Sequence, residues 1–148
     1  MQVLCGLTMK NVRLLGACLA VGLSAAGCAG SHALGPAGTI VPVNERDFAI
    51  SAPQHVAAGN VTLRVDNHGP DAHELIVVRT RDGKLPFRGD GLTVDEDAVE
   101  HSTVGVLEPG DASDVRELHL HLRPGRYVLF CNMSGHYLGG MRHVLEVR

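Results

Sequence analysis

Hydrophobic and polar residues alternate along most of the chain, after an apolar segment near its start. Residues 60–66 and 116–122 alternate with a period of two, which predicts β-strands with one buried face. Gly- and Pro-containing turns separate several further short β-prone runs, at 39–43, 47–51, 74–80, 126–131 and 142–147. No long helical pattern competes with them. We therefore predict an all-β domain built as an antiparallel sandwich.

Composition limits the function classes. The 148 residues suffice for one domain of ordinary size. A net charge of -3 argues against a nucleic-acid-binding protein, which normally carries a basic excess. Only 3% of the residues are aromatic and none is Trp, so a stacking surface for bases or sugars is not expected. The acidic, Gly-rich stretch 81–100 is predicted to be a solvated loop with one short helical turn.

The start of the chain has the pattern of an export signal. Lys10 and Arg13 precede an uncharged apolar run over residues 14–27. That run is shorter than the roughly 20 residues of a transmembrane helix, and small residues end it. We expect residues 1–27 to be a signal peptide. Met9 begins a more compact version of this leader, so the choice between Met1 and Met9 as the start stays open.

The leader ends in Ala25-Ala-Gly-Cys28, which is similar to the lipobox of bacterial lipoproteins. That resemblance implies cleavage before Cys28 and attachment of lipid to its sulfur, with ordinary secretion as the alternative. Residues 28–38 would then be the lipidated cysteine and a flexible, Gly-rich tether, and 39–148 the folded domain. The expected location is the extracytoplasmic face of the cell membrane, held there by the lipid anchor.

Of the four cysteines, Cys5 and Cys18 belong to the leader and Cys28 to the lipobox. Cys131 then has no partner for an internal disulfide. An exported free thiol is liable to oxidation unless something occupies it.

Cys131, His136 and Met141 recur at intervals of five. On a helix, five residues would separate Cys131 and His136 by about 140°. The three glycines between Cys131 and Met141 also disfavour a helix. A tight loop between two strands would instead bring thiolate, imidazole and thioether together. This donor set suits copper, and a single thiolate excludes a Cys-rich structural zinc site. A second imidazole comes from His73, where a turn enters a strand, or from His68 within that turn; we favour His73.

At these residues the chain resembles the cupredoxins, the small type 1 copper proteins. The loop Cys-x4-His-x4-Met follows a Pro-Gly-x-Tyr strand over 124–131, as in the rusticyanin and sulfocyanin group, and residues 56–75 are similar to that group's first-histidine region. The resemblance implies a Greek-key β-sandwich and one copper ion. Its ligands would be His73, Cys131, His136 and the axial Met141. The implied function is single-electron transfer between redox proteins, not enzymatic catalysis.

Alternatives to the electron carrier remain. A copper protein for trafficking or resistance would need an additional metal site, for which His119 and His121, on one face of a strand, are candidates; surface or core roles are the alternative. An oxidase or reductase subunit is disfavoured by the short chain and the absence of a second copper set. We expect Glu74 to be a solvated strand residue, with a hydrogen bond that braces the ligand loop as the alternative.

Overall fold

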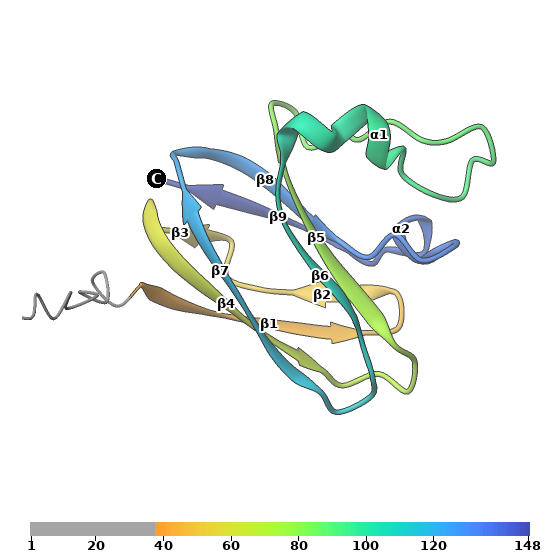
Figure 1. Ribbon diagram of the computed structural model, residues 1–148, viewed down its shortest axis with the longest axis horizontal. Coiled ribbons are helices and arrows are strands. Elements are labelled where there is room, and N and C mark those ends of the chain that lie inside the picture. The colour runs from red at the N-terminus through yellow and green to blue at the C-terminus, as the bar shows by residue number, and fades with distance from the viewer. Residues whose placement is uncertain (1–37) are drawn as a thin grey trace, which may run out of the picture. The chain divides into compact units, whose positions relative to one another are not determined.

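The computed structural model describes residues 38–148, which form a β-sandwich of two sheets (Figure 1). The expected signal peptide, lipidated Cys28 and tether lie outside the described residues, apart from Gly38. Within 38–148, no helix is long and apolar enough to cross a bilayer.

The first sheet has the strand order β2-β1-β4-β7 and the second β3-β9-β8-β5-β6. The first comprises β2 (Ala49–Ser51), β1 (Thr39–Arg46), β4 (Gly59–Asn67) and β7 (Val115–Leu122). The second comprises β3 (His55–Val56), β9 (Arg142–Val147), β8 (Gly125–Phe130), β5 (His73–Thr80) and β6 (Thr103–Gly110). The predicted sandwich is confirmed.

Two strand pairs are parallel, β1 with β4 and β3 with β9, and the others are antiparallel. After β1 the chain turns into β2, crosses to the second sheet at β3 and returns to enter β4 at the end where β1 began. This crossover makes β1 and β4 parallel, whereas a hairpin would have made them antiparallel.

The alternating runs predicted from the sequence are strands, with ends shifted by a few residues. The sequence did not indicate β3 and β6. The first is only two residues long. In β6, Val104 and Val106 lie on the exposed face, so the apolar–polar contrast that marks a half-buried strand is missing.

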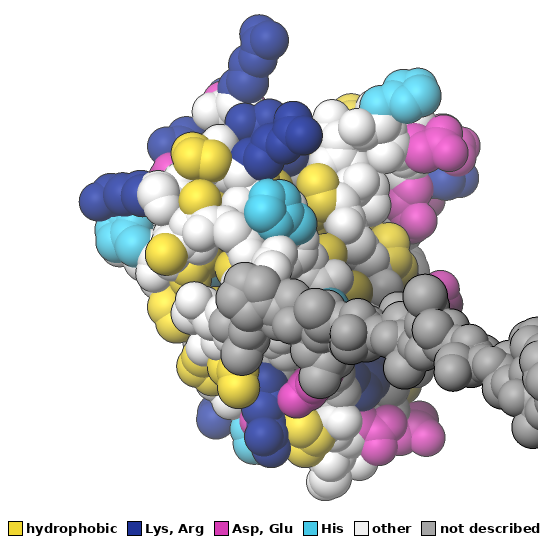
Figure 2. Space-filling model, turned by 60° about the vertical axis from the view of Figure 1, so that its left-hand side comes forward, with side chains coloured by type: hydrophobic (Ala, Val, Ile, Leu, Met, Phe, Trp, Pro, Cys, Tyr) yellow, Lys and Arg dark blue, Asp and Glu magenta, His cyan; other side chains and the backbone are white. Residues whose placement is uncertain are grey.

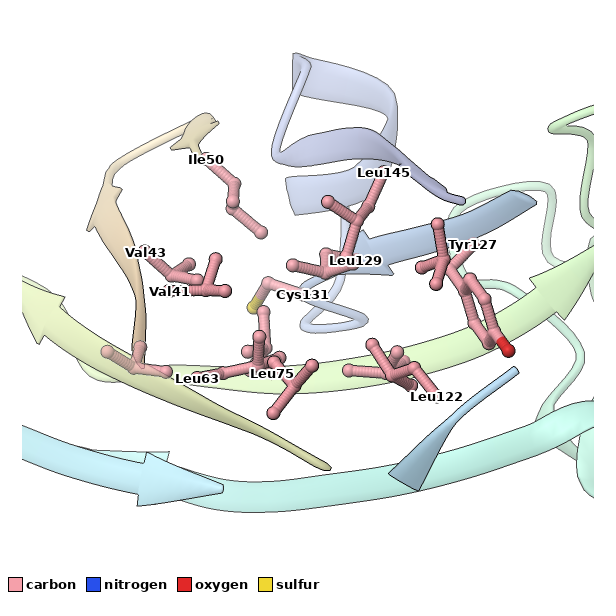
Figure 3. Packing of buried hydrophobic residues seen from close by; sticks show 14 of the residues in the cluster. Val41, Val43, Ile50, Leu63, Leu75, Leu122, Tyr127, Leu129, Cys131 and Leu145 are labelled. Atoms are coloured by element: carbon pink, nitrogen blue, oxygen red, sulfur yellow. The ribbon is translucent and has the colours of Figure 1, made fainter. Parts of the chain in front are cut away.

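The main core lies between the sheets and follows the predicted alternation. In β4, Val61, Leu63 and Val65 are buried. The core continues into the segment after β8, because Cys131 and Met141 belong to the same cluster and are fully buried. Figure 3 shows the Cys131 thiol among aliphatic side chains of both sheets.

Residues 81–102 cover the outer face of the second sheet, which corrects the expectation of a solvated loop. Leu85, Val94 and Val99 are buried in a second cluster with Ile76 and Val78 of β5. Because β5 is covered on both faces, its residues 75–78 are all buried. The expected helical turn is present as α1 (Glu96–Val99), followed by a 3₁₀ turn, η1 (Glu100–Ser102).

A buried ion pair joins β1 and β7 of the first sheet, and its arginine also reaches the second sheet. Glu45 of β1 occupies an inward-facing position and is fully buried, and its Oε2 accepts a hydrogen bond from Arg116 Nη2 at 2.7 Å. Arg116 also donates to the carbonyl of Glu108 in β6. Burial raises the pKa of Glu45 from 4.5 to about 7, although the Arg116 guanidinium opposes the shift.

This pair predicts a pH-dependent stability. The folded protein binds the Glu45 proton more tightly than the unfolded chain, so its stabilising contribution is lost as pH rises from about 4.5 to about 7. Glu45→Gln should abolish this loss, which amounts to about 3 kcal/mol at most. Urea unfolding of both metal-free proteins at pH 5 and pH 8 measures the difference. Parallel pH profiles for wild type and variant would contradict the assignment.

Candidate metal centre

Three of the residues singled out in the sequence meet at one end of the domain. The ligating atoms of His73, Cys131 and His136 all lie within 4.8 Å of one another. His73 and Cys131 are fully buried and His136 is partly buried. Among residues 38–148 this is the one group of three or more His, Cys, Asp or Glu side chains so arranged.

The register of β5 and β8 brings His73 and Cys131 together. These strands are antiparallel, with Ile76 opposite Phe130, so the start of β5 faces the end of β8. Cys131 directly follows β8, and His73 is the first residue of β5. The alternative for Glu74, and not the solvated role expected of it, is present: its Oε1 accepts from the backbone N–H of Asn132 at 3.0 Å. This bond continues the connection between the two segments beyond their paired residues.

The loop between β8 and β9 positions His136 and Met141. Gly135 and Gly140 have φ values of 81° and 114°, a left-handed conformation that favours glycine. They flank a single helical turn, α2 (His136–Gly139). The backbone N–H of Cys131 donates to the Met141 carbonyl at 3.2 Å, which closes the base of the loop and places Met141 beside Cys131. The prediction of a tight loop is confirmed, with one helical turn at its tip.

His73 presents one ring nitrogen to the cluster. Its Nε2 lies 3.1 Å from Asp47 Oδ1, and because a carboxylate accepts hydrogen bonds, Nε2 carries the proton. Nδ1 therefore has a free lone pair. It is buried and has no hydrogen-bond partner within 38–148. A buried acceptor without a partner is costly, and a bound metal ion would satisfy it.

Gly69 has no side chain, and this leaves room for the contact between Asp47 and His73. A Cβ at this position would lie 2.6 Å from Asp47 Oδ1 and 3.0 Å from His73 Nε2, so a larger residue would displace the carboxylate or the ring. Asn67 holds the same loop: its side chain accepts from the Gly69 N–H at 2.9 Å and donates to the Asp71 carbonyl at 2.8 Å.

His136 packs between two rings. Its centroid is 5.3 Å from that of His73 and 5.3 Å from that of Phe48, both in edge-to-face geometry. Its Nδ1 lies 3.5 Å from Cys131 Sγ. The turn between β1 and β2 thus contacts both imidazoles, His73 through Asp47 and His136 through Phe48. Sequence reasoning missed both turn residues, because they were assigned to a β-prone run at 47–51 and neither belongs to a spaced motif.

Burial sets the protonation of the two enclosed donors. It raises the pKa of the Cys131 thiol. It also lowers the pKa of His73, a shift that the hydrogen bond to Asp47 opposes. Without metal, the site therefore holds a neutral thiol and a neutral imidazole. Binding a metal through the thiolate releases a proton, which makes the affinity depend on pH.

Asn132 connects the ligand loop to the segment that covers the second sheet. Its side chain accepts from the Val94 N–H at 2.6 Å and donates to the Val94 carbonyl at 3.0 Å and to Glu96 Oε1 at 2.6 Å. The residue after Cys131 is therefore held from both sides, by Glu74 and by residues 94–96.

The other candidate histidines lie apart from the cluster. His68 is exposed, with its Nε2 3.2 Å from Asn44 Oδ1, so the structure favours His73 over it. His119 and His121 are exposed and use their Nδ1 atoms in contacts with Thr62 and Asn60 of β4. Neither belongs to the metal-binding group found within the described residues.

The carboxylate of Asp47 should control metal affinity through His73. Asp47→Ala removes the partner that fixes the ring and its tautomer, and loss of such a partner typically lowers metal affinity about 10- to 100-fold. Asp47→Asn keeps an acceptor oxygen in nearly the same shape and should retain most of the affinity. Competition titrations with copper measure both variants. Equal affinities for wild type and Asp47→Ala would show that the hydrogen bond does not position His73.

The donor set fits a type 1 copper site. One thiolate and two imidazoles, with a methionine beside them, are the combination found in blue-copper centres. The bare Nδ1 of His73 and the short distances among the three donors agree with that use. The cluster lacks the additional thiolates or carboxylates that structural zinc or calcium sites use.

A scan against protein-family models and a search of curated proteins gave no match. Solved structures did match. A reduced auracyanin from Roseiflexus castenholzii is 18% identical with a TM-score of 0.57, and the alignment covers 76% of this chain and 99% of that one. Auracyanin A of Chloroflexus aurantiacus, a "blue" copper protein, is 17% identical with a TM-score of 0.57, and the alignment covers 76% of this chain and 100% of that one. Rusticyanin from Thiobacillus ferrooxidans is 16% identical with a TM-score of 0.55, and the alignment covers 76% of this chain and 79% of that one. The chain therefore has the cupredoxin fold, and its His73–Cys131–His136 group fits the type 1 copper site of that fold.

Proposed function

We propose that this protein is a single-electron carrier that binds one copper ion through His73, Cys131, His136 and Met141. The observation that carries the proposal is the buried cluster of two imidazoles and a thiol within 4.8 Å at one end of the sandwich. When bound, copper supplies a one-electron couple between its cuprous and cupric states. Thiolate and thioether favour the first state, and imidazole tolerates both.

The protein holds these donors in place before and after electron transfer. His73 is fixed by Asp47, and the Cys131 N–H is bonded to the Met141 carbonyl at the base of the loop. Buried packing around Cys131 and Met141 keeps water away. A site whose ligands move little between oxidation states has a small reorganisation energy, which favours fast transfer. Four protein ligands leave no open position for a substrate, so we propose no enzymatic activity.

Electrons would pass through the edge of His136, around which apolar side chains are exposed. Phe48 contacts the ring, while Met133 and Leu138 flank it in the loop, with exposed fractions of 52%, 37% and 50%. Tyr137, in the same loop, does not share this patch because it is buried against Phe130 and Phe87. The proposed partners are redox proteins that dock on this apolar surface.

We also propose that the mature protein is anchored by lipid on Cys28 at the outer face of the cell membrane. The lipobox-like Ala25-Ala-Gly-Cys28 after a basic and apolar leader supports this.

Copper-loaded protein in the cupric state should be intensely blue or green, because a thiolate ligand gives a strong charge-transfer band. Cys131→Ser should bind copper without this colour. Visible spectroscopy with parallel metal analysis measures both proteins. A colourless wild-type complex that contains bound copper would disprove the site.

Met141→Leu should raise the reduction potential, because it removes a weak axial donor from cupric copper with little change in volume. The colour should persist, since the other three ligands remain. Cyclic voltammetry, with a competition titration for cuprous copper, tests this on both proteins. An irreversible couple with rapid copper loss on reduction would instead indicate copper trafficking.

Cys28→Ala should leave the protein unprocessed or release it from the membrane fraction. Mass spectrometry of the purified wild type should show a lipidated N-terminal Cys28. An unmodified Cys28, or cleavage after it, would exclude the anchor and leave the copper proposal unaffected.

A further inference from the structure

A basic groove of about 1080 Å³ opens on the domain away from the metal-binding cluster. It lies between the end of β5, the start of β6 and the turn that joins β7 to β8. The charged side chains that line it include Arg79, Arg81, Lys84, Arg123, Arg126 and Glu146.

Three of these cations are free to bind an external anion. Arg126 pairs with Glu146, the one acidic residue of the lining, at 2.6 Å, and Arg79 donates to the Pro124 carbonyl at 2.9 Å. Arg81, Lys84 and Arg123 are exposed, and none forms an ion pair with any carboxylate of residues 38–148. Unpaired cations gathered in one groove are notable in a chain whose net charge is -3.

The groove and the metal-binding cluster lie at opposite ends of the same strands. β8 begins with Gly125 at the groove and ends just before Cys131. At about 3.3 Å for each residue, the strand separates the two by about 20 Å. β5 likewise has His73 at one end and Arg79 near the other.

The groove shares its end of the domain with the start of β1. Thr39 pairs with Val61 of β4, and the neighbouring Asn60 pairs with His121, which lines the groove. The chain that precedes Gly38 therefore joins the domain near the groove. Figure 2 brings this side of the molecule forward and shows Lys and Arg side chains gathered in its upper part, with Asp and Glu mainly toward the right.

We propose that this groove docks on the anionic headgroups of the membrane that holds the chain. The inference rests on the proposed anchor at Cys28 and not on copper. Residues 28–38 span at most about 35 Å, so an anchored domain would keep the groove within reach of the bilayer surface. Each Lys or Arg near an anionic surface strengthens binding about fivefold.

A membrane fits this position better than an acidic redox protein. A redox partner must approach the metal-binding end for electrons to pass, and the groove lies about 20 Å away along β8. Docking the groove on lipid would turn the His136 end away from the bilayer and leave its apolar surface open to partners.

The test uses the full chain with Cys28→Ala, so that no lipid anchor contributes. Cosedimentation is measured with vesicles of phosphatidylcholine alone and with vesicles containing phosphatidylglycerol. Binding to neutral vesicles measures the contribution of the apolar leader. The additional binding to anionic vesicles, called the increment below, measures the contribution of the basic side chains. We expect this increment to fall with salt, and Arg81→Gln/Lys84→Gln/Arg123→Gln to lower it about a hundredfold.

Arg46→Gln/Arg64→Gln/Arg88→Gln is the matched control, with the same change in net charge at exposed positions outside the groove. It should keep the increment, and thermal unfolding should show that both triple variants fold. Equal losses in the two variants, or no preference of the parent chain for anionic vesicles, would overturn the proposal. Groove-dependent binding of inorganic phosphate or polyglutamate without binding to anionic vesicles would also overturn it, in favour of a soluble anion or an acidic protein.

Discussion

The antiparallel register between β5 and β8 is the constraint on which the metal-binding cluster depends. It places Ile76 opposite Phe130, so that the first residue of β5 and the residue after β8 come to one end of the sandwich. Cys131 and His73 are then donors at the edge of a rigid core, and the loop to β9 adds the remaining two residues. A shift by one residue in this register would turn the side chains of β5 to the opposite face, which would remove His73 from the cluster.

Much of this arrangement could be predicted from the sequence because its signals are local. Cys131, His136 and Met141 lie on one short loop, so their spacing alone brings them together. His73 was inferred because a turn leads into a strand at that point. Asp47 and Phe48 could not be found this way, since they reach the imidazoles only through pairing of strands distant in sequence. The buried apolar residues of 81–102 were missed because they are isolated among acidic and glycine residues.

The covering segment extends the support of the cluster beyond the sandwich itself. Asn132 ties the ligand loop to Val94 and Glu96, while Leu85, Val94 and Val99 pack against the outer face of β5 and β8. The strands that carry two of the proposed ligands are therefore buried on both faces. Glu45, in contrast, is a polar residue in the core. The alternation of β1 predicts an apolar side chain at this inward-facing position, but an acid occupies it. The partner, Arg116, offsets part of the cost of burying this acid.

The metal-binding cluster depends on the length of the two-residue turn at Asp47 and Phe48. Asn44 to Arg46 pair with Ala49 to Ser51 around it, and Phe48 adopts a left-handed conformation with φ of 60°. One inserted residue would change the conformation of this turn and displace the contacts to both imidazoles together. Homologues that keep both contacts should therefore tolerate substitutions in this hairpin more readily than insertions or deletions. The length of the turn, together with a hydrogen-bond acceptor at position 47, should therefore mark a shared site.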